Sequence, residues 1–470
     1  MRIPRVAKNL AAVFASRGFQ CHLVGGAVRD MMMGRSLSDL DIATDALPEQ
    51  VSSLFRRVVP TGIRHGTVTV LFQGARFEVT TFRTESSYSD GRRPDSVSFA
   101  PSILDDLSRR DFTINAMAYD LLAGRMEDPH GGARDLANRL IRAIGVPEER
   151  FREDGLRPLR ACRFAAQLGF SVDSETLLAI PRTLDVVAGV SAERVRDEVL
   201  KILASPVPSV GLELMRGTGI LGVVLPELCE GVGVAQGDLH CYDVFTHSLR
   251  ACDAAPAGPV GPAAAVGAPA GPVGPAAVEL RLAALLHDVG KPRALRMDEG
   301  GRPTFHGHEK LSRDLASSIL QRLRLPTAVV RRVAHLVEHH MFNYQEEWSD
   351  AAVRRFVARV GEDAIDNLFA LRRADQIGMC AENANVFPQG LALLADRVRA
   401  VREGDRAFTV GQLAVDGADI MSHLGIGPGP TVGAILAALL QAVLDDPAQN
   451  ERERLLEIAR RFYGERMGGA

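Results

Sequence analysis

The chain has 470 residues, enough for about three domains with separate cores, which argues against a small scaffold held by disulfides. Hydrophobic residues make up 46% and charged residues 24%, a balance that argues against a disordered or membrane-dominated chain. The formal net charge is −3, so the chain as a whole lacks the basic excess typical of many nucleic-acid-binding proteins.

The cysteines and the N-terminus indicate a cytoplasmic protein with no membrane partner. The six cysteines form no CxxC pair, so we expect reduced thiols and no zinc finger. The apolar run 10–15 is too short for a signal-peptide core and is closed by Arg17. Only four of the 55 positive residues are lysine, which a GC-rich genome explains better than selection for the bidentate phosphate contacts of arginine.

The distribution of periodicities predicts an α+β protein with a mixed head and a helical body. The first 125 residues alternate helical runs with the strand-like runs CHLV, GTVTVLF and RFEVTTF. From about Asn138 onward, segments such as ERVRDEVLKIL and AVVRRVAHLVEHH place apolar residues three and four apart, as packed amphipathic helices require.

A pair of carboxylates follows a glycine turn near the start of the head. The run CHLVGGAVRDMMMGRSLSDLDIATDA predicts a strand, a turn, a short helix and a second strand that carries Asp39 and Asp41. Side chains two apart on a strand share one face, and two carboxylates held that way need a cation such as Mg²⁺ between them. Glu78, on the strand RFEVTTF, is a third carboxylate that could complete a two-metal centre.

The glycine turn itself suits a phosphate. Gly25 and Gly26 let the backbone approach an anion closely, with N–H groups at the helix start and Arg29 as a bidentate donor. The alternative is an ordinary tight turn followed by a loop cap, and each half of the pattern alone would be weak.

Three later runs carry a family resemblance together with GGAVRD and DLD, namely SRRDFTINAMAYD, DPHGGARDL and EDGLRPLRACRF. In order and spacing the chain resembles the class II tRNA nucleotidyltransferase and poly(A) polymerase family. The resemblance implies a polymerase-β-like nucleotidyltransferase head, Asp39 and Asp41 as Mg²⁺ ligands, and contacts of Gly26, Arg29 and Arg110 with the nucleotide. It also implies that residues 111 and 115 support that site.

The last of these runs predicts a base-recognising pair. Asp154 and Arg157 lie three apart, so on a helix they would share a face and present an acceptor beside a donor. That pair suits the amino groups of cytosine and adenine and repels the carbonyl groups of uracil and guanine. The resemblance places Arg160 and Arg163, on the same face, against the nucleotide. The alternative is a surface ion pair.

The segment Arg83 to Pro94, RTESSYSDGRRP, resembles the flexible loop that the family associates with addition of the final A. Because the segment has its full length here, it favours addition of CCA or of A over addition of CC alone. A solvated loop without that role is the alternative.

Histidines and aspartates in the helical body, in DVFTHS, LLHDVGKP, FHGHE, VEHH and RRADQ, resemble an HD-type phosphohydrolase domain. The resemblance implies metal binding, as imidazoles and carboxylates permit for a divalent transition metal. The implied first-ion ligands, followed by two candidates for a second ion, are His247, His287, Asp288 and Asp375, then His308 and His339.

Two further segments complete the chain. The stretch Ala254 to Val278 contains the octet AGPVGPAA twice, and its prolines and glycines predict a surface loop instead of a membrane helix. Near the end, Thr431 is expected to cap a helix that runs toward Leu444. The tail around it resembles the tRNA-holding segment of bacterial relatives, although an ordinary helical hairpin would fit equally.

The expected domains are a nucleotidyltransferase head at 1–137, a helical neck at 138–225, an HD-type domain at 226–400 and a tRNA-binding tail at 401–470. The predicted function is template-independent addition of CCA to the tRNA 3′ end from CTP and ATP, with Mg²⁺ as cofactor. Alternatives are an A-adding or CC-adding enzyme, a poly(A) polymerase, or an HD-type phosphohydrolase with an RNA-binding head. The oligomeric state is not predicted.

Overall fold

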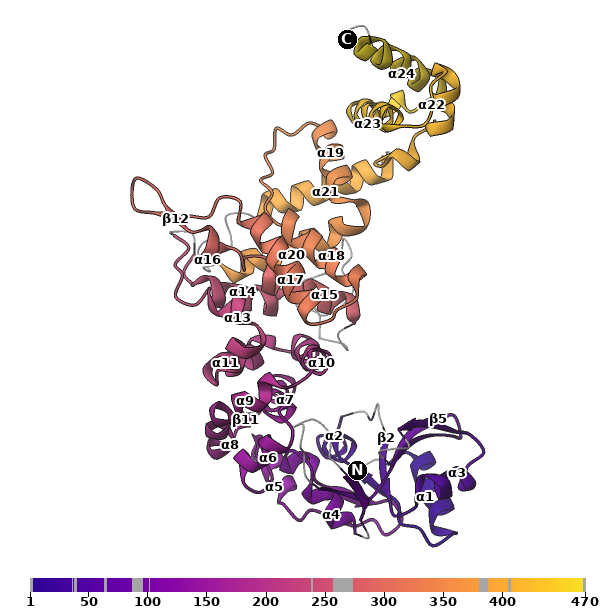
Figure 1. Ribbon diagram of the computed structural model, residues 1–470, viewed down its shortest axis with the longest axis vertical. Helices are drawn as coiled ribbons and strands as arrows, with labels where there is room; N and C mark the ends of the chain where they lie inside the picture. Colours follow the sequence, from indigo (N-terminus) through magenta and orange to yellow (C-terminus); the bar gives the residue numbers. More distant parts are fainter. Residues whose placement is uncertain are drawn as a thin grey trace. The chain divides into compact units, whose positions relative to one another are not determined.

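The computed structural model describes residues 3–35, 37, 40–62, 66–86, 96–100, 102–237, 240–256, 274–379, 388–404 and 407–467 (Figure 1). The chain divides into two compact units, 1–229 and 230–470, which are described separately. The expected head and neck together make up nearly all of the first unit, and the expected HD-type domain and tail make up the second. Helix α21 (Pro388–Gly404) runs across the expected boundary at residue 400.

A seven-stranded mixed sheet organises the first unit, in the order β3-β4-β5-β2-β1-β8-β9. Only the β2–β5 neighbours are parallel among the described pairs of this sheet. The strands are β1 (His22–Val24), β2 (Leu40–Thr44), β3 (Val58–Gly62), β4 (Thr67–Phe72), β5 (Ala75–Thr81), β8 (Ala118–Asp120) and β9 (Met126–Glu127). The three strand-like runs of the sequence therefore correspond to β1, β4 and β5.

Alternating apolar residues anchor this sheet. In β5 the side chains of Phe77 and Val79 are buried while Arg76 and Glu78 are exposed, which is the period of two expected for a strand with one core face. The helices of the head are α1 (Arg5–Ala15), α2 (Gly26–Met32), α3 (Pro48–Leu54), α4 (Ile103–Ser108) and α5 (Gly132–Ala137). The period therefore fixes which side of the sheet carries Glu78.

A separate hairpin joins β6 (Arg83–Ser86) to β7 (Ser96–Phe99). The predicted loop over 83–94 is thus a strand at its start, and its remaining residues lie outside the described part of the chain.

The neck is mainly helical, with α6 (Pro147–Glu153), α7 (Leu156–Leu168), α8 (Ser174–Ala179), α9 (Leu184–Ala188), α10 (Ala192–Leu203), α11 (Pro208–Gly217), α12 (Ile220–Val224) and α13 (Pro226–Cys229). The expected helical neck also contains one short parallel strand pair, β10 (Leu140–Ile141) with β11 (Ser171–Val172).

The second unit is built from α14 (Val244–Ala254), α15 (Pro275–Leu286), α16 (Lys291–Ala294), α17 (His308–Arg322), α18 (Thr327–His339), α19 (Asp350–Val360), α20 (Glu362–Gly378), α21, α22 (Gly417–Leu424), α23 (Pro430–Asp445) and α24 (Arg452–Met467). The strands β12 (Arg296–Met297) and β13 (Pro303–Thr304) form a small hairpin. Helices α22 to α24 share a core that includes Ile420, Ile435, Leu439 and Leu455.

Two helix starts differ from expectation, and proline explains both. Helix α15 begins at Pro275, so the end of the stretch predicted as a loop is helical, while residues 257–273 lie outside the described part. Helix α23 begins at Pro430 with Gly429 at its N-cap, so Thr431 lies inside the helix and does not cap it. Proline suits the first helical position because its missing N–H needs no partner there and its φ is already helical.

The cysteines correct one expectation. Cys21, Cys162, Cys229 and Cys252 are free thiols, but Cys241 is disulfide-bonded, so reduced thiols are not the rule throughout. Sequence spacing does not reveal which distant thiols a fold brings together. Within the described residues, every helix is too short or too polar to cross a bilayer.

Candidate functional site

The glycine turn before α2 leaves room for an arginine. Gly25 has a φ of +65°, and a Cβ there would lie 2.7 Å from Nη1 of Arg110. Arg110 donates from that nitrogen to the carbonyl of Asn115 (3.2 Å) and from Nη2 to Asp106 (3.0 Å). Gly25 is therefore needed both for the left-handed backbone and for the approach of this guanidinium. Gly26, the first residue of α2, lies close to Arg29.

Asp106 is a site residue that the sequence did not single out. It is buried, and both Arg109 (2.6 Å) and Arg110 (3.0 Å) pair with it. Burial alone would raise the pKa of Asp106, but the two guanidinium groups outweigh burial and lower it. The acid therefore stays charged and holds Arg110 over the glycine turn.

Two of the three expected metal-binding carboxylates lie side by side. Asp41 on β2 and Glu78 on β5 are partners in the register of the parallel pair, so their side chains leave the sheet on the same face. Asp41 is half-buried and Glu78 is exposed. Asp39 lies outside the described residues. Oxygen ligands of this kind suit a hard divalent cation.

A chain of hydrogen bonds links α2 to α7 through the segment 111–115. Arg29 donates to Asn115 Oδ1 (2.8 Å), Asn115 donates to Asp111 (3.2 Å), and Arg160 donates to Asp111 Oδ2 (2.7 Å). Burial alone would raise the pKa of Asp111, but Arg160, Asn115 and Arg157 outweigh it and lower the pKa to about 2. The buried carboxylate therefore fixes the arginines expected to meet the nucleotide.

Phe164 of α7 gathers the guanidinium groups. Arg163, Arg29 and Arg160 lie 4.0, 5.3 and 5.5 Å from the centre of its ring, within cation–π range. Arg163 also pairs with the buried Glu198 of α10 at 2.9 Å. Burial lowers the pKa of Arg163 to about 10, although Glu198 opposes the shift. The ring and the acid together hold three like charges close to one another.

The two residues expected to recognise the base, Asp154 and Arg157, do not lie on one helix, which corrects the expected geometry. Asp154 follows the last residue of α6 in an extended conformation, and Arg157 lies in the first turn of α7. The break occurs at Gly155, where a Cβ would lie 2.2 Å from the carbonyl oxygen of Val186.

The two side chains of this pair have different partners. Arg157 is buried and bonds to Glu153 and to the carbonyl oxygens of Arg150 (2.8 Å) and Arg109 (3.0 Å). Asp154 is half-buried and bonds to Arg194 at 2.7 Å. The arrangement provides an acceptor and a donor from adjacent elements instead of one shared helical face.

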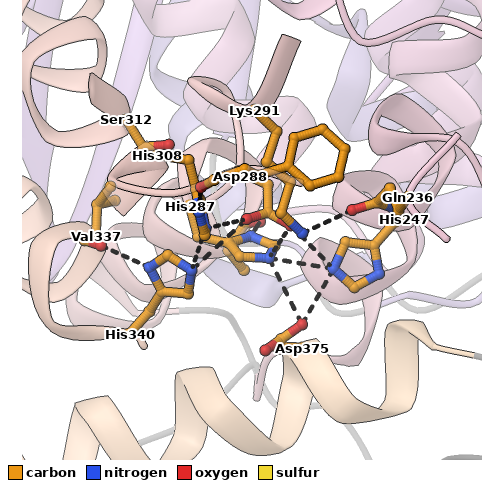
Figure 2. Close-up of polar contacts among 12 residues, drawn as sticks. Gln236, His247, His287, Asp288, Lys291, His308, Ser312, Val337, His340 and Asp375 are labelled. Atoms are coloured by element: carbon orange, nitrogen blue, oxygen red, sulfur yellow. Dashed lines mark hydrogen bonds and ion pairs between the residues drawn. The ribbon is translucent and has the colours of Figure 1, made fainter. Parts of the chain in front are cut away.

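In the second unit, histidines and aspartates from several helices converge (Figure 2). This histidine cluster consists of His247, His287, Asp288, His308, His340 and Asp375. All six side chains are buried. Two groups within it have their ligand atoms within 4.8 Å of one another: His247, His287 and Asp288, and then Asp288, His308 and His340.

Short contacts between imidazoles indicate that the histidine cluster requires positive charge. Nε2 of His247 lies 3.2 Å from Nε2 of His287, and Nε2 of His308 lies 3.4 Å from Nε2 of His340. Asp288 lies between the pairs, with Oδ2 3.2 Å from His287 Nε2 and Oδ1 3.2 Å from His308 Nε2. Asp375 Oδ1 lies 3.0 Å from His247 Nε2.

The outer nitrogens of three of these rings set the direction of the inner ones. Nδ1 of His287, His308 and His340 faces a backbone carbonyl oxygen at 2.8, 2.8 and 2.7 Å. A proton on Nδ1 leaves the lone pair of Nε2 directed into the cluster, as in metal-ligating histidines. The Nε2 lone pairs of these three rings, in two ligand groups that share Asp288, fit a divalent metal.

His340, and not the expected His339, lies against Asp288. The distance from His340 Nε2 to Asp288 Oδ1 is 3.6 Å, whereas Nδ1 of His339 bonds to the carbonyl of His335. Adjacent residues at a helix end point in directions about 100° apart, so a motif with two consecutive histidines does not decide between them. Each of the other expected residues of the HD-type domain lies in the cluster.

A cavity of about 930 Å³ opens beside the histidine cluster. Lys291 Nζ lies 2.7 Å from Asp288 and donates to Gln236 (2.7 Å). Basic side chains recur along the cavity wall, namely Lys291, Arg302, Lys310, Arg359 and Arg372. Such a wall suits an anionic ligand next to the metal-type donors.

Together, the mixed sheet with paired carboxylates, the arginine-lined neck and the histidine cluster define a nucleotidyltransferase joined to an HD-type domain. Three family models match in this order: the Poly A polymerase head domain over residues 21–142, the Probable RNA and SrmB-binding site of polymerase A over 169–231, and the HD domain over 239–379.

Relatives then identify the family. A CCA-adding enzyme of Lactiplantibacillus plantarum is 33% identical over 97% of this chain and 96% of its own length. An A-adding tRNA nucleotidyltransferase of Deinococcus radiodurans is 37% identical over 89% of this chain and 90% of its own. The crystal structure of the Bacillus stearothermophilus CCA-adding enzyme in complex with CTP matches with a TM-score of 0.71 at 29% identity, covering 100% of both chains. The chain belongs to the family of CCA-adding enzymes.

Proposed function

We propose that this chain adds CCA to the 3′ end of tRNA, without a template, from CTP and ATP. Support comes from the family, from relatives named CCA-adding enzymes and from a solved relative that holds CTP. The single arrangement that favours transfer of a nucleotide is the carboxylate pair of β2 and β5 in one sheet, with α2, which carries Arg29, packed against β2. The proposed setting is the cytoplasm.

In the proposed reaction the tRNA 3′ hydroxyl gives its proton to Glu78, and its oxygen forms a bond to the α-phosphorus of the nucleotide. The bond from that phosphorus to the oxygen of the β-phosphate breaks, and pyrophosphate leaves. Asp39 and Asp41 would hold Mg²⁺, which when bound supplies charge stabilisation for the attacking and leaving oxygens. Glu78 supports this site, and Arg29, Arg110, Arg160 and Arg163 neutralise the phosphates beside Gly26.

Asp154 and Arg157 select the base in this proposal. The carboxylate of Asp154 accepts from the amino group of cytosine or adenine, and the guanidinium of Arg157 donates to the neighbouring ring nitrogen. Uracil and guanine present a carbonyl oxygen to the carboxylate, and an unpaired buried acceptor is costly.

The test offers the enzyme tRNAs that end before CCA, after C and after CC, each with CTP, ATP or both. Products resolved on a gel should extend to CCA in every case that the supplied nucleotides permit. Extension only from tRNA ending in CC would indicate the A-adding alternative, which is the activity that the name of the Deinococcus radiodurans relative gives. Failure with all three substrates would remove the proposal.

Asp41→Ala serves as the catalytic arm of this test. We expect transfer to fall by at least about a thousandfold while tRNA binding persists, since the change removes a metal-type ligand and no arginine. Asp105→Ala is the matched control, because Asp105 is an exposed carboxylate of the same unit. Undiminished transfer in Asp41→Ala would contradict the assignment.

A second candidate function is metal-dependent hydrolysis of a phosphate ester in the cavity beside the histidine cluster. The two ligand groups that share Asp288 favour it, with a divalent transition metal as the ion. The residues that would hold it are His247, His287, Asp288, His308, His340 and Asp375. This activity would accompany nucleotidyl transfer, because the paired carboxylates of the head argue against a head that only binds RNA.

Adjacent histidines provide a matched pair for testing this site. We expect His340→Ala to lower the bound transition metal by at least half after dialysis, measured by inductively coupled plasma mass spectrometry, because it removes a directed lone pair. His339→Ala should leave the metal content unchanged, since its Nδ1 bonds to the His335 carbonyl and its side chain belongs to neither ligand group. The reverse order of effects would overturn the ligand set.

A further inference from the structure

Helix α10 supplies an arginine to the proposed base-recognising carboxylate. Nη2 of Arg194 donates to Oδ2 of Asp154 at 2.7 Å, and both side chains are partly buried. Helix α10, which carries Arg194, packs against α7, which begins just after Asp154 (Figure 1). The residues are 40 positions apart in the chain. The contact is therefore tertiary.

Asp154 needs such a partner because its own backbone does not fix it. The residue lies between α6 and α7 with φ −148° and ψ 108°, outside either helix. Its Oδ1 accepts the N–H of Leu156 at 3.0 Å, and its Oδ2 is held by Arg194. An ionised carboxylate has about four acceptor positions, so both oxygens are oriented while each keeps a lone pair for a base amine.

The neighbouring Arg157 is committed elsewhere. Its guanidinium bonds to Glu153 and to two backbone carbonyl oxygens. Arg194 has fewer partners than Arg157. Its Nη2 donates to Asp154, while its Nη1 is buried without a hydrogen-bond partner among the described residues. A buried donor left unpaired is a cost that packing alone would not favour. The placement of Arg194 is therefore explained by Asp154.

We propose that Arg194 is a positioning residue for base selection, which it exerts by fixing the orientation of the Asp154 carboxylate. The inference rests on the proposed role of Asp154. A carboxylate held at both oxygens cannot turn away from an incoming carbonyl group, so uracil and guanine remain repelled. Without Arg194 the carboxylate can rotate about χ1 and χ2, and the penalty for a wrong base falls.

The test measures kcat/KM of the full-length enzyme for CTP and for UTP on tRNA lacking CCA. In Arg194→Met we expect the CTP-to-UTP ratio to fall by about tenfold or more, as expected for loss of one hydrogen bond between charged groups. Arg194→Lys should restore most of the ratio, because it keeps the charge. Arg196→Met is the matched control on the same helix, since Arg196 pairs with Asp197, and its ratio should equal that of the unmodified enzyme.

If kcat/KM in Arg194→Met falls by the same factor for CTP and for UTP, the ratio is unchanged. That result would show a merely structural role and overturn the inference. If that variant does not fold, Arg194→Gln replaces it, and a CTP-to-UTP ratio in Arg194→Gln equal to that of the unmodified enzyme would also overturn the inference.

A double variant separates this inference from the role of Asp154. Asp154→Ala with Arg194→Met should show the ratio of Asp154→Ala alone, because Arg194 acts through that carboxylate. If Asp154→Ala retains its selectivity, the base-recognising role itself fails and the inference fails with it. If Asp154→Ala loses selectivity while Arg194→Met keeps it, only the inference about Arg194 is overturned.

Discussion

Buried acids of the first unit each lie against an arginine, and these pairs explain how a chain of net charge −3 can present cations to phosphates. Asp106 pairs with Arg109 and Arg110, and Glu198 pairs with Arg163. Removing one partner of a buried pair costs roughly 3–5 kcal/mol, because the other charge stays buried alone. These acids therefore hold the arginines in place, and the net charge of the chain does not show that positive side chains are concentrated locally.

The lowered pKa of Asp111 makes the free energy of unfolding depend on pH. Its folded pKa of about 2 lies below its ordinary value of 3.8, so the stabilisation is present above about pH 4 and is lost as the pH falls toward 2. We expect Asp111→Asn to lower the free energy of unfolding at pH 7 by roughly 2 kcal/mol, at 1.4 kcal/mol per unit of pKa shift.

Urea unfolding followed by circular dichroism at a series of pH values checks this prediction. The difference in unfolding free energy between Asp111→Asn and the unmodified protein should be constant from pH 7 to about 4 and should become smaller below pH 4. Asp105→Asn, an exposed carboxylate of the same unit, should differ by less than about 0.5 kcal/mol at every pH. A gap for Asp111→Asn that widens with acid would contradict the ion-pair account.

The sequence could predict the residues of the short motifs but not their distant partners. Arg29, Arg110 and Arg160 were expected beside the nucleotide, and the structure brings Arg29 and Arg160 to one hydrogen-bonded chain. Glu198 and Arg194 were missed because their contacts depend on how α10 packs with α7, and Phe164 was missed because its contact with Arg29 depends on how α7 lies against α2. One signal was available for Glu198, which is an acid on the apolar face of the predicted amphipathic helix.

At the scale of elements, hydrophobic periodicity located the three strand-like runs and the helices of the body, whereas a single glycine divided one predicted helix. Asp154 and Arg157 were expected to share one helix, but α6 ends at Glu153 and α7 begins at Leu156. Gly155 packs against the carbonyl of Val186 in α9, and no local pattern announces a contact 31 residues away. Tertiary packing here overrides the helical pattern.

Gly155→Ala tests this junction. A Cβ at 2.2 Å from a backbone oxygen and 2.6 Å from its carbon must displace α9 or the Asp154 loop, so we expect a loss of about 2–3 kcal/mol in unfolding free energy. Base selectivity should decline as well, because the displaced loop carries Asp154. Gly217→Ala is the control: this helical glycine of α11 has no atom within 4 Å of an added Cβ, and alanine there should be neutral or stabilising by up to about 1 kcal/mol. Chemical denaturation measures the unfolding free energy of both variants, and equal values would contradict the close packing of Gly155 against Val186.

At the scale of the whole molecule, the two proposed sites lie in different units of the chain. The carboxylates and arginines assigned to nucleotidyl transfer lie within residues 1–229, and every member of the histidine cluster lies within residues 230–470. The donor sets differ as well, with carboxylate oxygens in the head and mainly imidazole nitrogens in the second unit. Hard oxygen sites favour Mg²⁺, and imidazole sites favour transition metals.

This separation predicts that each site can be disabled alone. His340→Ala should lose bound transition metal and still add CCA within about twofold of the unmodified rate, since changes at sites without shared partners act independently. Asp41→Ala should abolish transfer and keep its full complement of transition metal. Metal analysis and tRNA extension on the same preparations provide both readouts, and the double variant should show the two losses together with no additional effect on either. A large loss of CCA addition in His340→Ala, in a protein that remains folded by circular dichroism, would instead establish energetic coupling between the units, and the histidine cluster would then have to be counted as part of the tRNA enzyme.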